Sequence, residues 1–191
     1  YYLKSLERAT WHFESPLNHP NTIGVYLLSQ RAKQFVTVLL SGEGADEVFG
    51  GYERVSALKH PYHWRNILSA IRKSKGSLKR LARDFGSPVM RSILSSAFMS
   101  PADASLLKGD FDITCAIDER ERIFENLTGD FFDRQAKYEI MTYLPDLLIR
   151  QDKMSMAHSI ENRVPFLDND LVEQSFAIPV SDLIGNGDAK G

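Results

Sequence analysis

The feature that most constrains this chain is FVTVLLSGEGADEVFGG, where an apolar run passes through a glycine turn into a helix-forming stretch. Residues 35–40 are β-branched or apolar, which predicts a short buried strand of the kind found in parallel sheets. Ser41–Gly44 forms the turn, and Ala45 is expected to open a helix. Because helical apolar spacing precedes the strand as well, the pattern predicts an α/β fold.

The glycine turn is a candidate ligand site, because open α/β sheets bind ligands at the carboxyl ends of their strands. Gly42 and Gly44 let backbone N–H groups approach phosphate oxygens, and a helix N-terminus favours negative charge. Glu43 and Asp46 would repel phosphate unless Mg²⁺ lay between them. Two alternatives stay open: Glu43 acts as a general base, or Asp46 and Glu47 only favour the helix dipole.

A second candidate site is the segment RQDKMSMAHSIENRVPFLD. It places Lys153 among the apolar residues Met154, Met156 and Ile160, and a lysine held there is a point charge suited to phosphate. The alternative is a lysine that extends along the surface to water. No second histidine or cysteine stands at metal-ligand spacing from His158, which is therefore expected to be a packed or exposed helix residue.

Elsewhere the apolar spacing predicts mostly helix, in the ranges 3–13, 23–34, 131–143, 146–156 and 169–177. Pro165 predicts an extended RVPFLD segment, because proline excludes the preceding Val164 from helical geometry. Asp168 is suited to cap the last helix. Glu161 and Arg163 are expected to pair with each other or to hold the loop that follows them.

Composition narrows the functional classes. A net charge of −2 excludes a nucleic-acid-binding role for the chain as a whole, and no apolar run approaches the ~18 residues of a membrane span. A single cysteine precludes an intrachain disulfide and points to a reducing, cytoplasmic location. Ten basic residues and one acid lie between Arg54 and Arg91. They form either a solvated helical face or a surface that attracts an anion or an acidic partner.

Two long motifs carry a family resemblance. SGEGADEVFGGY and DKMSMAHSIENRVPFLD resemble the synthetase domain of glutamine-hydrolysing asparagine synthetases, and PLNHPNTIGVYLLS resembles the helix region that precedes them. The resemblance covers most of residues 12–178. It implies a partial ATP pyrophosphatase-type parallel sheet, of the adenine nucleotide alpha hydrolase-like class, with a largely helical C-terminal part. Residues 1–191 would form part of one synthetase domain, with a helical insertion at 55–130.

The resemblance also implies an activity, that of a carbon–nitrogen ligase of asparagine biosynthesis. ATP would adenylate aspartate to β-aspartyl-AMP, and ammonia that a glutaminase domain releases from glutamine would displace AMP. ATP and Mg²⁺ are the implied cofactors. Aspartate and the glutaminase domain of the parent chain are the implied partners, with a homodimer as a candidate assembly and neither nucleic acid nor membrane involved.

Site residues follow from the resemblance position by position. Glu43 would help to form the adenylate or take a proton from ammonia, Asp46 would bind Mg²⁺, and Lys153 would stabilise the phosphates as pyrophosphate leaves. Contact with ATP, or support of the nucleotide loop, would fall to Ser41, Gly42, Gly44 and Glu47.

The chain also departs from the family pattern. The Ser-Gly-Gly-x-Asp-Ser pyrophosphate loop is absent, and Cys115 lies mid-chain, where it cannot be the N-terminal glutaminase nucleophile. We therefore expect a fragment of a longer protein, inactive and marginally stable alone. Glu14-Ser15-Pro16 stands where many relatives have Asp-Glu-Pro. Because of this difference, a paralogous amidotransferase or cyclase that adenylates another carboxylate remains an alternative, as does a binding module without catalysis.

Overall fold

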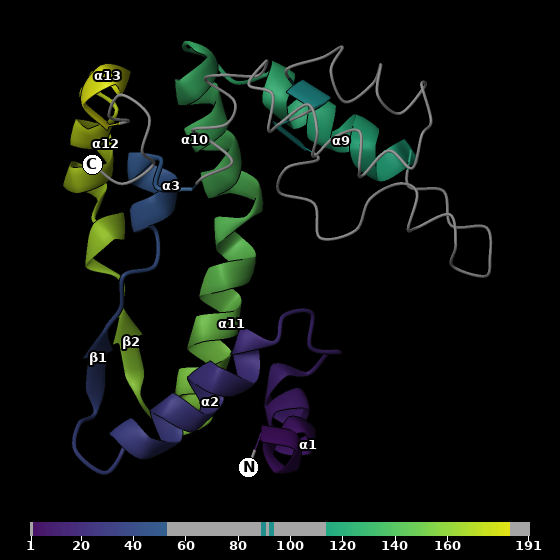
Figure 1. Ribbon diagram of the computed structural model, residues 1–191, viewed down its shortest axis with the longest axis vertical. Coiled ribbons are helices and arrows are strands. Elements are labelled where there is room, and N and C mark those ends of the chain that lie inside the picture. The colour runs from purple at the N-terminus through teal and green to yellow at the C-terminus, as the bar shows by residue number, and fades with distance from the viewer. Residues whose placement is uncertain (1, 53–88, 91, 94–113, 184–191) are drawn as a thin grey trace, which may run out of the picture. The chain divides into compact units, whose positions relative to one another are not determined.

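The structure is a computed structural model that describes residues 2–52, 89–90, 92–93 and 114–183 (Figure 1). The chain divides into two compact units. The first comprises residues 1–48 and 140–177, and the second comprises residues 49–139 and 178–191. Most of the predicted helical insertion at 55–130 lies outside the described residues, so that prediction stays open.

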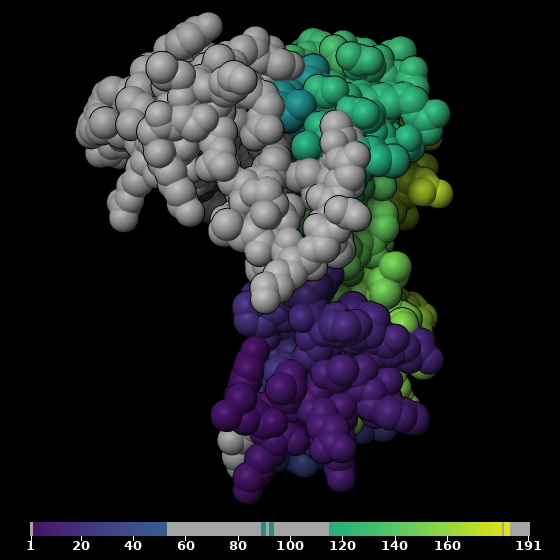
Figure 2. All heavy atoms as spheres, turned by 90° about the vertical axis from the view of Figure 1, so that its right-hand side faces the viewer, coloured from purple at the N-terminus to yellow at the C-terminus, as the bar shows by residue number. Residues whose placement is uncertain are grey.

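Three helices form the core of the first unit: α1 (Tyr2–Phe13), α2 (Asn21–Ala32) and α11 (Leu144–Met156). Ala9 and Phe13 lie one turn apart on α1, and Ile23 and Tyr26 lie one turn apart on α2, so each pair shares one helix face. Both faces pack with Met154 of α11. All three helices contact one another. Figure 2 shows the surface of α1 and α2 in purple.

The helix boundaries differ from the predicted ones by a few residues. α2 begins at Asn21 rather than 23, and α11 begins at Leu144 rather than 146. The earlier start of α11 is possible because Pro145 occupies the first turn, where proline's missing N–H would have no helical partner. α3 (Ala45–Phe49) begins at the predicted residue.

The first unit contains a parallel strand pair, β1 (Val38–Leu40) and β2 (Glu161–Arg163), with Val38 opposite Glu161. Backbone hydrogen bonds continue the pairing beyond both ends: Glu161 N–H donates to Thr37 O at 2.9 Å, and Ser41 N–H donates to Arg163 O at 2.9 Å. The predicted α/β class and parallel pairing are therefore confirmed. In the described residues the sheet has two strands.

The prediction of a buried strand at 35–40 is wrong in length and in burial. The N–H groups of Phe35 and Val36 both bond to Ala32 O, so these residues close the end of α2 instead of entering the strand. Leu40 is 71% exposed. Burial of a strand side chain depends on what packs on the face of the sheet, and the described residues leave Leu40 largely uncovered.

The segment after β2 is only partly extended. Val164 has non-helical backbone angles (φ −121°, ψ 79°), as Pro165 predicts, but η1 (Pro165–Leu167) is a 3₁₀ turn. The fixed φ of proline suits such a turn, which explains the correction. Asp168 caps α12 (Asn169–Ser175) as predicted: its carboxylate accepts the N–H groups of Asp170 and Leu171 at 3.1 and 3.4 Å.

The second unit contains α9 (Thr114–Glu125), most of α10 (Phe131–Thr142) and α13 (Val180–Leu183). Phe124 and Tyr138 pack with ring centroids 5.6 Å apart beside Ile93. A buried polar pair accompanies this core, in which the Gln135 amide donates to Glu139 Oε1 at 2.8 Å. No helix in the described part of the chain has both the length and the apolarity to cross a membrane.

Candidate functional site

The turn between β1 and α3 requires glycine at one position. Gly44 has φ +92°, in the left-handed region that other residues adopt only with strain. A Cβ atom placed there would lie 2.3 Å from Leu167 Cδ2. The glycine thus lets the turn pack directly on η1, so the two sequence motifs meet in the first unit, at the carboxyl ends of the strands.

Gly42 has different surroundings. In the part of the chain that the structure describes, no heavy atom lies within 4 Å of a Cβ atom placed at Gly42, so space lies open beside the backbone. Ser41 Oγ accepts the Glu43 N–H at 3.4 Å, and Gly42 O accepts the Ala45 N–H at 3.2 Å. The backbone conformation of the turn is thereby fixed on one side and open to a ligand at Gly42.

The acidic residues of the turn and of α3 differ in how deeply their side chains are buried. Glu43 and Asp46 are half-buried, whereas Glu47 is only 2% exposed. Such burial suits the predicted support of the loop by Glu47 better than direct contact with a ligand. The described residues contain no group of three His, Cys, Asp or Glu side chains arranged for a metal. Magnesium at Asp46 would therefore take further ligands from phosphate oxygens, water or other parts of the protein.

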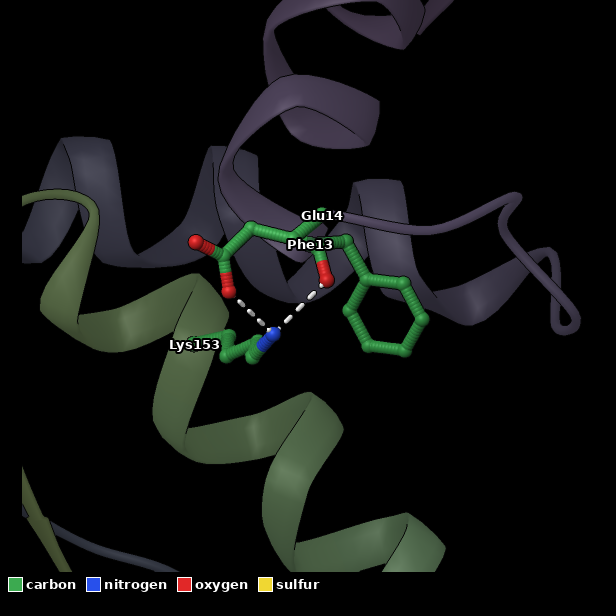
Figure 3. Close-up of polar contacts among 3 residues, drawn as sticks. All are labelled: Phe13, Glu14 and Lys153. Carbon is green, nitrogen blue, oxygen red and sulfur yellow. Dashed lines mark hydrogen bonds and ion pairs between the residues drawn. The ribbon is translucent and has the colours of Figure 1, made fainter.

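Lys153, in the last turn of α11, makes two hydrogen bonds to the residues that end α1 (Figure 3). Its Nζ donates to Phe13 O at 2.9 Å and to Glu14 Oε2 at 2.7 Å, and it lies 5.7 Å from the centroid of the Phe13 ring. The Lys153 side chain is 32% exposed. Neither hydrogen bond involves the Ser41–Gly44 turn, so the structure does not test a direct contact between Lys153 and Glu43.

Glu14 is the residue of this arrangement that sequence reasoning missed. It has φ 63°, unusual for a non-glycine residue, and its carboxylate is 76% exposed. The hydrogen bond from Lys153, and then the lysine's charge, hold the pKa of the Glu14 carboxyl below its usual value. Exposed ion pairs contribute little to stability, so we read this one as orienting the lysine. The sequence did offer a signal for Glu14, because it is the acidic residue of Glu14-Ser15-Pro16, the stretch that stands where many relatives have Asp-Glu-Pro.

His158 is packed, as predicted, but it lies in the turn that follows α11 and not in a helix. Its ring packs on Tyr26, with centroids 4.4 Å apart, and burial, followed by the charge of His12, lowers its pKa. Glu161 and Arg163 pair through Arg163 Nε and Glu161 Oε1 at 2.8 Å. Burial also lowers the pKa of His19, assisted by the charge of Arg150.

Comparisons with known proteins identify the family. The family model for asparagine synthase matches residues 2–191. The chain is 32% identical to asparagine synthetase [glutamine-hydrolyzing] 1 of Bacillus subtilis (strain 168), an alignment that covers 99% of this chain and 32% of that protein. It is 26% identical to a putative asparagine synthetase [glutamine-hydrolyzing] of Mycobacterium tuberculosis (strain ATCC 25618 / H37Rv), over 93% of this chain and 29% of that protein.

A relative with another name is amidase chry2 of Gibberella zeae, 26% identical over 92% of this chain and 31% of that protein. The chain spans about a third of the length of these curated relatives. No solved structure matches it, so the ATP pyrophosphatase-type arrangement stays a prediction. Because the family model extends over residues 2–191 and includes both motifs that meet at Gly44, the chain belongs to the asparagine synthase family.

Proposed function

We propose that this chain contributes part of the ATP site of an enzyme that amidates aspartate to asparagine. In this reaction the aspartate side chain attacks the α-phosphate of ATP, giving β-aspartyl-AMP and pyrophosphate, and ammonia then displaces AMP. One observation carries the proposal: the turn that follows β1 is open at Gly42, at the carboxyl end of a parallel strand pair. The chain belongs to the asparagine synthase family, and open α/β sheets bind ligands at this end of their strands.

Each residue of the turn has a role in this proposal. Ser41 and Gly42 contact ATP through the open side of the turn. Glu43 assists formation of the adenylate or accepts a proton from ammonia. Asp46 would hold Mg²⁺, which would supply positive charge beside the phosphates.

Lys153 supplies the positive charge of the protein itself. Its ammonium is oriented by Phe13 O and Glu14, and it stabilises the phosphate oxygens as pyrophosphate leaves. The lysine exchanges one of these two acceptors for a phosphate oxygen when ATP binds. In this mechanism Glu14 positions the lysine and does not touch the reacting atoms.

The complete reaction requires more than these 191 residues. The Ser-Gly-Gly-x-Asp-Ser pattern that grips pyrophosphate in the family is not in this sequence, and neither is a glutaminase domain that would supply ammonia. We propose that both belong to the same longer protein and that the 191 residues alone do not turn over. AMP production by the 191-residue chain alone would contradict this part of the proposal.

The function is tested by pyrophosphate release from the full-length protein, supplied with ATP, Mg²⁺ and ammonia. We expect release to depend on aspartate and to be lost in Glu43→Ala. A panel of other carboxylates, run in parallel, tests the alternative that a paralogous enzyme adenylates a different acid. Release with another carboxylate and none with aspartate would transfer the function to that alternative.

A second prediction concerns the open space beside Gly42. Gly42→Ala is expected to raise the KM for ATP by about tenfold or more, because the added methyl group occupies the space through which phosphate approaches, and tenfold corresponds to about 1.4 kcal/mol. Gly42 has no left-handed backbone, and the methyl group meets no neighbour among the described residues, so the unfolding free energy should be unchanged. Steady-state kinetics and denaturant unfolding measure the two quantities.

Gly24→Ala is the matched control. Gly24 lies inside α2 and also has open space around a Cβ atom, but it is not part of the turn. Alanine favours helix there, so this variant should be as stable as the wild type or more stable, with an unchanged KM for ATP. An unchanged KM in Gly42→Ala would show that ATP does not approach the turn at this residue.

A further inference from the structure

A cavity of about 450 Å³ lies in the first unit, and its lining residues include neither the glycine turn nor Lys153 and its two acceptors. Its volume is within the range of small-molecule sites, roughly 300–1,000 Å³. We call it the histidine pocket. Its walls come from α1, α2 and the residue pair that follows α11, and the side chains that matter are Arg8, Trp11, His12, Tyr26, Gln30 and His158.

Aromatic rings form a continuous series along the wall of the histidine pocket. Tyr26 contacts His158 and also His12, whose ring centroid lies 5.9 Å away, and His12 meets Trp11 edge-on at 4.8 Å. Trp11 is 75% exposed although tryptophan is a large apolar side chain. Rings that are held in place but not covered are suited to stack on a flat ligand.

The charge of the histidine pocket selects the sign of that ligand. Among the described residues that line the pocket, Arg8 is the one with a permanent charge, and none is an acid. A guanidinium binds carboxylates through two parallel N–H donors. Gln30 adds an amide, which can donate to the same group. A flat ring with a carboxylate therefore fits this lining better than a neutral ring or a cation.

His158 carries an unsatisfied polar atom at the wall of the histidine pocket. Its Nε2 is buried and has no hydrogen-bond partner among the described residues. A buried polar atom without a partner costs free energy that a hydrogen bond would recover. Because the imidazole torsion χ2 is broad, a small rotation can turn this nitrogen towards a bound carboxylate.

We propose that the histidine pocket binds a small planar anion, an aromatic or heteroaromatic ring that carries a carboxylate. The site is separate from the proposed ATP site, and its test does not depend on the reaction. Arg8 pairs with the carboxylate, Trp11 and His12 contact the ring, and the imidazole of His158, one of the lining residues, rotates to supply a hydrogen bond.

The test is a titration of the protein with benzoate, followed by tryptophan fluorescence. These 191 residues contain two tryptophans, Trp11 and Trp64, so Trp64→Phe leaves Trp11 as the one tryptophan of this segment. We expect saturable quenching by benzoate, with at least tenfold weaker binding of benzamide, which lacks the charge, and of inorganic phosphate, which lacks the ring. NMR shifts of the imidazole resonances, assigned with His158→Asn, give a second readout.

Arg8→Met is expected to weaken benzoate binding at least tenfold, because methionine retains the apolar stem but removes the guanidinium. Arg31→Met is the control. Arg31 lies on α2 with its guanidinium over the Phe35 ring, and it is not among the residues that line the pocket. Equal binding of benzamide and benzoate would overturn the charge argument. No saturable response in either fluorescence or NMR would overturn the site, including the case in which another part of the protein covers it.

Discussion

Replacing Lys153 by methionine is expected to lower kcat for aspartate-dependent pyrophosphate release by about 10²–10³-fold, the usual cost of losing one preorganised charge-stabilising group. Methionine has nearly the same length and keeps the packing of the stem, but it cannot carry charge to phosphate. The measurement is steady-state pyrophosphate release by the full-length protein at saturating ATP and aspartate. The lysine acts mainly when negative charge develops on the leaving pyrophosphate. We therefore expect kcat to fall and the KM for aspartate to change little.

Lys33→Met is the matched control for this experiment. Lys33 Nζ also donates to a backbone carbonyl, Ser159 O at 2.8 Å, but it is not among the proposed site residues. The Lys33→Met variant should therefore have the same kcat as the wild type. Glu14→Gln keeps an acceptor oxygen and removes the charge that orients Lys153, so its loss in kcat should lie between those of the two lysine variants. Wild-type turnover in Lys153→Met would refute the role of Lys153 in the reaction.

Gly44→Ala is expected to lower the free energy of unfolding by about 2–5 kcal/mol. Left-handed backbone costs a non-glycine residue roughly 1–2 kcal/mol, and forcing a methyl group into a packed contact costs about 1–3 kcal/mol. Both costs apply here, since Gly44 has φ +92° and its Cβ would lie 2.3 Å from Leu167 Cδ2. Denaturant unfolding of the wild type and the variant measures the difference.

A double-mutant cycle separates the two costs. Leu167→Ala removes the side-chain atoms that the new methyl group would meet, so Gly44→Ala should cost less in that background, with the backbone cost remaining. Gly42→Ala should change the unfolding free energy by no more than about 0.5 kcal/mol, the usual range for open surface positions. Strict additivity of Gly44→Ala and Leu167→Ala would show that the two residues do not pack together.

Predictions that rest on neighbouring residues agree well with the structure. The start of α3 at Ala45, the cap at Asp168 and the pairing of Glu161 with Arg163 all depend on groups within a few residues of one another. Backbone hydrogen bonding and short side-chain reach decide such features, so the printed sequence is sufficient. The family assignment rests on the same kind of local information, since each motif is a continuous segment.

Predictions that depend on distant neighbours fared less well. The strand at 35–40 was expected to be buried, but burial depends on what covers a strand, and Leu40 has little cover in the described residues. Strand β2 was not predicted, because its three residues Glu161, Asn162 and Arg163 are polar, and pairing with β1 holds them extended. The turn η1 formed where an extended segment was expected.

The sequence by itself determined the order of strand, turn and helix, the glycine at Gly44, the cap at Asp168 and membership of the asparagine synthase family, because each depends on continuous segments. The tertiary structure alone decided that Lys153 bonds to Phe13 and Glu14, and that Gly44 packs on Leu167. Both contacts join segments more than a hundred residues apart. Such pairs are chosen by the packing of helices and strands, which local propensity does not encode.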